Sequence, residues 1–336
     1  MTRRDRTTGL PTEPRTDHSQ NRGNFFKSLQ TGRYAVIAIT LILLVFVIGF
    51  FGYRIYEKDN WGEKTILSVG DETFSLHYYA DRFSYYVQIN PGIGIPILQE
   101  SLLFTLENEA LIKILAEEKG IVVDEDLIDK ALETLFGVRK KILGKSNQDF
   151  EMYLEMQLGI TGMERSSFER FIAVSEAERL LLAKLKSEMP GGGELLTFRS
   201  VVVGTELEAA DAFARIQSGE DMGSIAQIDS LDRVGRQNDG LTTKPSSLIS
   251  EKIFSVLENL EIGGISSHPI QLDENLWAVI RYEELLTVQT YSEEHLSDLA
   301  IQNLNDLVKN ARARVMIKRN LSSEDIAVVE DHMRVE

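Results

Sequence analysis

Residues 190–203 read Pro-Gly-Gly-Gly-Glu-Leu-Leu-Thr-Phe-Arg-Ser-Val-Val-Val and mark a change of character in this 336-residue chain. Pro followed by three Gly is a strong loop signal, because these residues interrupt both helices and strands. The run of strand-forming residues at 197–203 predicts a β-strand directly after the loop. We therefore place a boundary here, between a helical region and a region of mixed helix and strand.

The chain after this boundary alternates short helical and strand patterns. Helices are expected over 206–218, 221–229 and 250–260, strands over 197–203, 265–270 and 276–282, and a loop over 230–247. Short elements in this order predict a compact α+β domain. We assign residues 194–285 to it.

The chain before the boundary is dominated by helical periodicity. Residues 66–73 predict a short strand and a turn, and an aromatic stripe predicts that a helix begins at Phe74. Apolar residues at three- and four-residue spacing predict further helices over 98–119, 146–158 and 164–189. Another helix is expected from residue 124 to about Leu135, with an extension to Ile142 as the longer alternative. We assign residues 60–190 to one helical domain.

A long amphipathic helix is expected over 292–318, close to the C-terminus. Its apolar stripe consists of Leu296, Leu299, Leu307, Ala311 and Val315. Such a stripe has to be buried against another element of the protein. We expect residues 290–320 to pack back on the helical domain, which makes the α+β domain an insert.

Residues 34–53, YAVIAITLILLVFVIGFFGY, contain no charged side chain. A helix of this length spans roughly 30 Å, the thickness of the hydrocarbon core of a bilayer. Tyr34 and Tyr53 at its two ends suit the membrane interface. The sequence therefore predicts a single N-terminal transmembrane helix.

Charge predicts the direction of this helix. Residues 1–58 hold nine Lys and Arg against four Asp and Glu, which gives them a net charge of +5. Because the whole chain carries −16, the remaining residues carry −21. The positive-inside rule places the basic tail 1–33, which has too few apolar residues to fold, in the cytoplasm and the remaining bulk outside. A cleaved signal peptide is the alternative, but the apolar run is too long and no A-x-A site follows it. The acidic body argues against binding to nucleic acid.

Several stretches carry a resemblance to a known family. They are 69–75 (Val-Gly-Asp-Glu-Thr-Phe-Ser), the helix 98–120 with the acidic cap after it, and 150–184. These stretches resemble the N-terminal chaperone region of SurA, PrsA and PpiD proteins. The segment 196–284 is similar to the parvulin-type (PpiC) peptidyl-prolyl isomerase domain of those proteins. The apolar anchor looks most like PpiD-type proteins, and the absence of Cys argues against a PrsA-type lipoprotein.

The resemblance implies where an isomerase site would lie. Parvulins resemble one another in two facing histidines, a Cys or Asp, and an apolar pocket for proline. Ser200 stands at the position of the first histidine and Ala278 at that of the second. Asp232 matches the Cys or Asp position, so Asp232 and Ser200 are positional candidates for catalysis. An exposed loop acid is the alternative interpretation of Asp232.

The same resemblance implies an apolar pocket for the substrate. Its positions fall at Leu248 or Ile249 and at Ile253 or Phe254, with an uncertainty of one residue in the register. Leu248, Ile249, Phe254 and Ala278 are the candidate substrate-binding residues. Packing in the core of the domain is the alternative interpretation of Ile249 and Phe254.

The sequence contains no phosphate-binding loop, nucleophile elbow or zinc-protease motif, and we expect no metal or cofactor. Because both histidines are replaced, we expect weak or absent isomerase activity. The predicted function is a membrane-anchored, extracytoplasmic folding factor that binds unfolded or newly translocated polypeptides in a cleft between the helical region and the small domain. A translocon is a further candidate partner. The alternatives are an active parvulin-type isomerase and a non-catalytic scaffold of a translocon or envelope complex.

Overall fold

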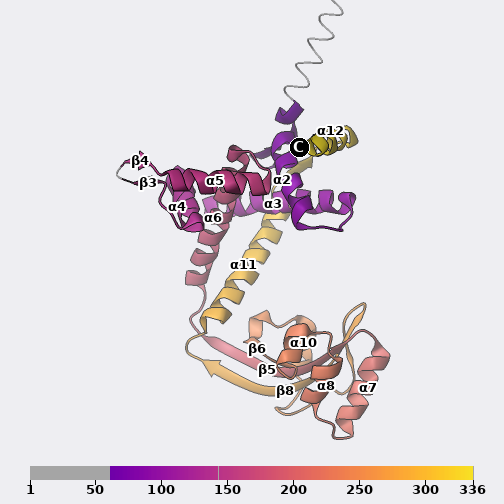
Figure 1. Ribbon diagram of the computed structural model, residues 1–336. Coiled ribbons are helices and arrows are strands. Elements are labelled where there is room, and N and C mark those ends of the chain that lie inside the picture. Colours follow the sequence, from indigo (N-terminus) through magenta and orange to yellow (C-terminus); the bar gives the residue numbers. More distant parts are fainter. Residues whose placement is uncertain (1–60, 143, 336) are drawn as a thin grey trace, which may run out of the picture. The chain divides into compact units, whose positions relative to one another are not determined.

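The computed structural model describes residues 61–142 and 144–335 (Figure 1). The predicted tail 1–33 and the predicted transmembrane helix 34–53 lie outside these residues. Within the described ranges, no helix is both long and apolar enough to cross a membrane. The chain divides into two units, residues 1–64, where the 3₁₀ helix η1 (Trp61–Glu63) is described, and residues 65–336.

The second unit begins with a small sheet and a group of helices. Its helices before the boundary are α2 (Leu76–Ile89), α3 (Ile95–Glu118), α4 (Glu125–Phe136), α5 (Gln148–Thr161) and α6 (Arg165–Glu188). Asp124 caps α4, where its carboxylate accepts a hydrogen bond of 3.0 Å from the backbone N–H of Leu127. Helix α3 contacts both α2 and α6, and buried apolar side chains of α4, α5 and α6 form one cluster.

One predicted boundary in this region is wrong. Phe74 belongs to strand β2 (Glu72–Ser75), which forms a hairpin with β1 (Thr65–Val69), so α2 starts after it. The helix predicted to run to about Leu135 ends at Phe136 and does not extend to Ile142, because Gly137 adopts a left-handed conformation with φ 68°. The short hairpin β3 (Lys141–Ile142) and β4 (Lys145–Ser146) follows.

The C-terminal helix α11 (Glu293–Arg314) packs against α6 and α3, as its apolar stripe predicts (Figure 1). It is shorter than predicted, because residues 317–319 form strand β9 (Ile317–Arg319). This strand pairs with the free edge of β1 and completes a sheet with the order β2-β1-β9. Helix α12 (Ser323–Val335), which the sequence analysis did not predict, follows.

The α+β part contains a four-stranded antiparallel sheet with the order β6-β5-β8-β7. Its elements are β5 (Gly193–Val203), α7 (Glu206–Gln217), α8 (Met222–Asp229), α9 (Arg233–Gln237), β6 (Leu241–Pro245), η2 (Ser246–Leu248), α10 (Glu251–Leu257), β7 (Ile270–Asp273) and β8 (Leu276–Val288). Side chains alternate between the two faces of such a sheet. Val201 and Val203 pack with α7 and α8 on one face, whereas Phe198 and Ile280 pack with α10 on the other.

The glycine stretch at the boundary is tightly packed rather than free. Gly193 already belongs to β5 and pairs with Val288 of β8. The backbone N–H of Tyr291 donates a hydrogen bond of 2.6 Å to the carbonyl of Gly191. A Cβ atom on Gly192 would collide with the backbone carbonyls of Val288 and Gln289. The absence of a side chain at Gly192 therefore allows the two chain segments to approach closely.

Candidate functional site

Ser200 and Ala278, which the resemblance aligns with the parvulin histidines, lie on the same face of the four-stranded sheet. Ser200 of β5 pairs with Ile280 of β8, and Val202 pairs with Ala278. Ala278 is fully buried and Ser200 is 6% exposed. Because alanine has no ionisable group and a serine hydroxyl does not titrate near neutral pH, neither position can serve as a histidine does in acid–base chemistry.

Two of the predicted pocket residues lie on this same face. Ile249 and Phe254 are half-buried and pack, together with Val202, against the apolar cluster that contains Ala278. Leu248 is half-buried at the end of η2 but is not a member of that cluster. The structure therefore brings Ser200, Ala278, Ile249 and Phe254 to one sheet face, which retains partly exposed apolar side chains.

Asp232 lies beside the end of β5 and caps a short helix. Its Oδ1 atom accepts hydrogen bonds from the backbone N–H groups of Val234 (3.1 Å) and Gly235 (3.0 Å) at the start of α9. By accepting these bonds, the carboxylate acts as the N-cap of α9, a role that aspartate commonly has. Asp232 is half-buried, so the structure gives its side chain a structural role without removing it from solvent.

The chain next to Asp232 is held against β5 where β6 no longer pairs with it. The Oγ atom of Ser230 accepts a hydrogen bond of 3.1 Å from the backbone N–H of Val202, and Leu231 N–H donates one of 2.6 Å to the Val202 carbonyl. Ser230 is almost completely buried. These bonds hold the two residues before Asp232 beside Val202, which packs against the cluster that contains Ala278.

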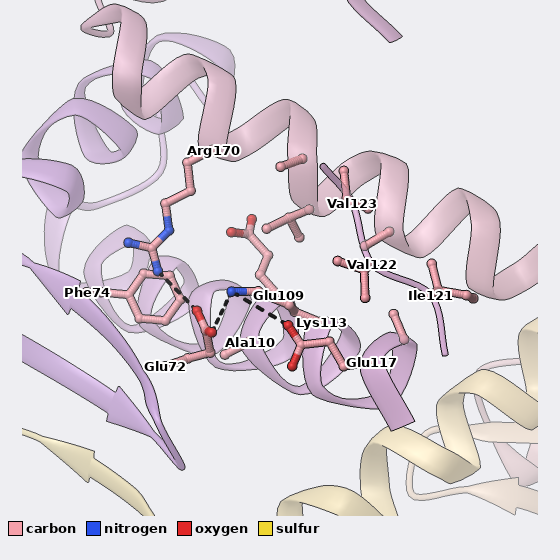
Figure 2. Close-up of a pocket in the computed structure, with 14 residues that line it drawn as sticks. Glu72, Phe74, Glu109, Ala110, Lys113, Glu117, Ile121, Val122, Val123 and Arg170 are labelled. Carbon is pink, nitrogen blue, oxygen red and sulfur yellow. Dashed lines mark hydrogen bonds and ion pairs between the residues drawn. The ribbon is translucent and has the colours of Figure 1, made fainter. Parts of the chain in front are cut away.

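A second candidate site is a pocket in the helical part of the unit, which the sequence analysis missed (Figure 2). It has a volume of about 160 Å³ and lies between the β1–β2 hairpin, α3, α6 and the segment after α3. Alanines of α3 and α6 line it, with Ala173 and Ala177 one helical turn apart on α6. The small side chains at these positions leave the hollow open. The spacing of these alanines is the only feature of the sequence that points to the pocket.

Apolar side chains complete the walls of this pocket. Phe74 lies on one side, and Ile121, Val122 and Val123 lie on the other (Figure 2). Phe74 is almost fully buried, whereas Val122 is 68% exposed. The pocket thus has an apolar interior and an apolar residue exposed at its margin.

The charged groups around this pocket are paired with one another. The Nζ atom of Lys113 lies 2.5 Å from a carboxylate oxygen of Glu72 and 3.9 Å from one of Glu117. The guanidinium of Arg170 lies 3.7 Å from Glu72 and stacks over the ring of Phe74 at 4.4 Å. The rim therefore carries two cations and two carboxylates of balanced charge.

A buried ion pair lies next to the pocket. Glu109, which also lines the pocket, accepts hydrogen bonds of 2.9 and 2.7 Å from the two terminal nitrogens of Arg82. The same guanidinium stacks over Phe171 at 4.5 Å. Paired bonds of this kind satisfy both buried charges, so Glu109 brings no unbalanced charge to the pocket. Within the described residues, no cluster of three or more acidic or histidine side chains could hold a metal ion.

Comparisons with known proteins give similar structures but no sequence family. No family model matches the chain, and no curated protein matches it. The peptidyl-prolyl isomerase PrsA of Bacillus anthracis is 15% identical with a TM-score of 0.40, and the match covers 63% of this chain and 96% of that one. The foldase PrsA of Streptococcus pneumoniae is 14% identical with a TM-score of 0.34, over 74% and 93%.

SurA-like chaperones are also among the similar structures. One of two such proteins from Campylobacter jejuni is 14% identical with a TM-score of 0.27, over 58% of this chain and 92% of that one. PrsA and SurA-like proteins, which the sequence also resembles, are thus among the solved structures similar to this chain.

Proposed function

We propose that this protein is a membrane-anchored, extracytoplasmic folding factor that binds unfolded or newly translocated polypeptides. In this role the α+β domain contributes apolar binding surface and has weak or no prolyl isomerase activity. The anchor and its direction rest on the sequence of residues 1–58. Binding between the helical region and the small domain, and contact with a translocon, stay predictions.

One observation carries the proposal. The sheet face that holds Ser200 and Ala278 is lined by apolar side chains, among which Ile249 and Phe254 remain partly exposed. Apolar surface of this kind supports binding of apolar segments with broad specificity, because burial of apolar area has no directional requirement. The two small residues at the histidine positions favour binding without acid–base chemistry.

A prolyl isomerase assay tests the catalytic part of the proposal. We expect the full chain in phosphatidylcholine nanodiscs to leave the rate of cis–trans exchange in a short X-Pro peptide close to its uncatalysed value, which corresponds to tens to hundreds of seconds. The rate is measured by coupling the exchange to a protease that cleaves only the trans form. A robust acceleration that disappears in Asp232→Ala would instead identify an active parvulin-type isomerase.

A second assay separates a folding factor from a scaffold. We expect the same preparation to suppress the aggregation of a chemically unfolded model protein, measured by light scattering, while empty nanodiscs do not. No suppression at several-fold molar excess would favour the scaffold of a translocon or envelope complex.

A further inference from the structure

We propose that the pocket between α3 and α6 binds one large apolar side chain, of the size of Phe or Leu, from an extended segment of a client polypeptide. The proposal rests on the proposed function and names the part of a client that this pocket takes. It is independent of the sheet face described above, because the pocket is formed entirely by the helical part of the unit and the β1–β2 hairpin.

The volume of the pocket fits a single side chain. It measures about 160 Å³. An apolar cavity of about 150 Å³ in a protein core can hold one benzene molecule. A phenylalanine or leucine side chain is of this size, whereas a folded element is far too large to enter. The pocket therefore selects one protruding side chain rather than a helix or a strand.

The lining explains why this side chain should be apolar. Ala110, Ala173 and Ala177 expose only methyl groups to the hollow, and Phe74 and Val174 add larger apolar surface. Burying a Phe or Leu side chain against such walls removes its apolar surface from water, which favours binding. A polar side chain in the same place would lose its hydrogen bonds to water.

The rim explains why the occupant should be an uncharged polypeptide. Lys113 and Arg170 offer hydrogen-bond donors, and Glu72 and Glu117 offer acceptors, in balanced numbers. A peptide backbone presents both carbonyl acceptors and N–H donors, so it can exchange hydrogen bonds with both kinds of group. An anionic or cationic ligand would find as much repulsion as attraction at this rim.

The exposed segment after α3 provides an approach to the pocket. Val122 is 68% exposed at its margin, next to Ile121 and Val123, which line it (Figure 2). A client segment can contact this apolar margin before its side chain enters the hollow. The same residues form the wall that would close over an inserted ring.

The test uses the full chain in phosphatidylcholine nanodiscs and a capped peptide, Gly-Ser-Gly-Phe-Gly-Ser-Gly, whose ring carries one fluorine. We expect broadening of the peptide's fluorine NMR line, and unlabelled peptides with a central Phe or Leu should reverse it. A peptide with central Ala should not. Ala173→Leu should weaken binding about tenfold, because the leucine fills the space for the ring. Ala177→Leu fills the same hollow from the next turn and serves as the second variant.

Ala210→Leu is the matched control, because Ala210 is exposed on α7 in the α+β domain. It should leave binding unchanged, and thermal unfolding of all three variants checks that each one folds. Unchanged binding in both pocket variants, or equal competition by the Ala peptide, would overturn the pocket as the binding site. Self-association of the chain that both pocket variants abolish would assign the pocket to a second copy and also overturn the proposal.

The same variants separate this inference from the proposed function. If both pocket variants bind the peptide as well as the original chain does, and all three suppress aggregation, the pocket proposal fails while the folding-factor proposal stands. If the original chain neither suppresses aggregation nor binds the peptide, both fail. Reduced suppression in the pocket variants alone, with unchanged thermal stability, supports both.

Discussion

Glu107 of α3 and Arg312 of α11 are 205 residues apart in the sequence and form an ion pair. The same carboxylate accepts a hydrogen bond of 2.5 Å from Arg319 of β9, and it is only 1% exposed. One acid of the N-terminal helices therefore holds two cations that follow the α+β domain. This contact joins α3 to two elements that lie after the α+β part of the sequence.

Removal of this carboxylate should destabilise the helical region. We expect Glu107→Ala to lower the free energy of unfolding by about 3 kcal/mol, because two arginines lose a buried partner. Urea unfolding measures the change, and a double-mutant cycle with Arg312→Ala isolates the pair. Glu118→Ala, which removes an exposed partner of Arg314, is the control and should change stability by less than about 1 kcal/mol. Equal effects of the two substitutions would contradict the central role of Glu107.

The same contact predicts how stability depends on acid. Burial alone would raise the pKa of Glu107, but hydrogen bonds from Arg319 and Arg312 outweigh it and lower the pKa below its ordinary value of 4.5. An acid with a lowered folded-state pKa stabilises the fold above its unfolded pKa, and this contribution is lost as the pH falls through the folded value. We therefore expect thermal stability to drop below about pH 4.5. Glu107→Gln should flatten this part of the profile, and an unchanged slope would count against the assignment.

Glu178 of α6 predicts a change of opposite sign. Burial, with a smaller contribution from the nearby Glu109, raises its pKa. An acid whose pKa is raised in the folded state destabilises that state when it is ionised. This destabilisation disappears as the pH falls through the folded-state pKa. We expect Glu178→Gln to raise the melting temperature at pH 7 and to have less effect at low pH. Calorimetry at pH 7 and near pH 4 checks this, and a lower melting temperature at pH 7 would refute it.

How much of the fold could be predicted from the sequence depends on whether each helix or strand is determined by neighbouring residues or by distant ones. The helix predicted over 98–119 is α3, since its apolar spacing and the Gly after it are local features. Strand β6 was missed because Thr242, Thr243 and Lys244 show no buried alternation. Its conformation comes from pairing with β5, and strand preference depends strongly on such context. Strand β9 was assigned to a helix for the same reason, because its partner β1 lies far away in the chain.

The candidate sites also differ in whether they leave a local signal in the sequence. Ser200 and Ala278 could be placed together because alternate residues of paired strands share a face. The pocket between α3 and α6 could not be predicted from the sequence, because Ala110 and Ala173 lie on two different helices and face a common hollow only in the folded chain. The capping role of Asp232 was also not apparent, because α9 is too short for a periodic apolar pattern.

Asp232 allows a capping role to be separated from a chemical one. Asp232→Ala should lower the free energy of unfolding by about 1 kcal/mol, because the N–H groups of Val234 and Gly235 lose their acceptor. Asp232→Asn keeps an acceptor but not the acid, so it should retain most of the stability. Chemical unfolding of the two variants makes the comparison. Equal losses in both would indicate that the negative charge matters more than the cap.

A histidine at position 278, which the resemblance aligns with the second parvulin histidine, should not be tolerated on steric grounds. Ala278 is fully buried in β8, opposite Val202 on one side and Ile270 on the other. Ala278→His adds a ring to a filled core, which costs about 1–3 kcal/mol by overpacking, and a buried imidazole without partners adds a similar amount. We expect a large fall in melting temperature and no gain in prolyl isomerase activity, even with Ser200→His. Ala210→His at an exposed position of α7 is the matched control and should leave stability nearly unchanged. A stable, active double variant would instead mean that the apolar face of the sheet keeps room for both imidazoles.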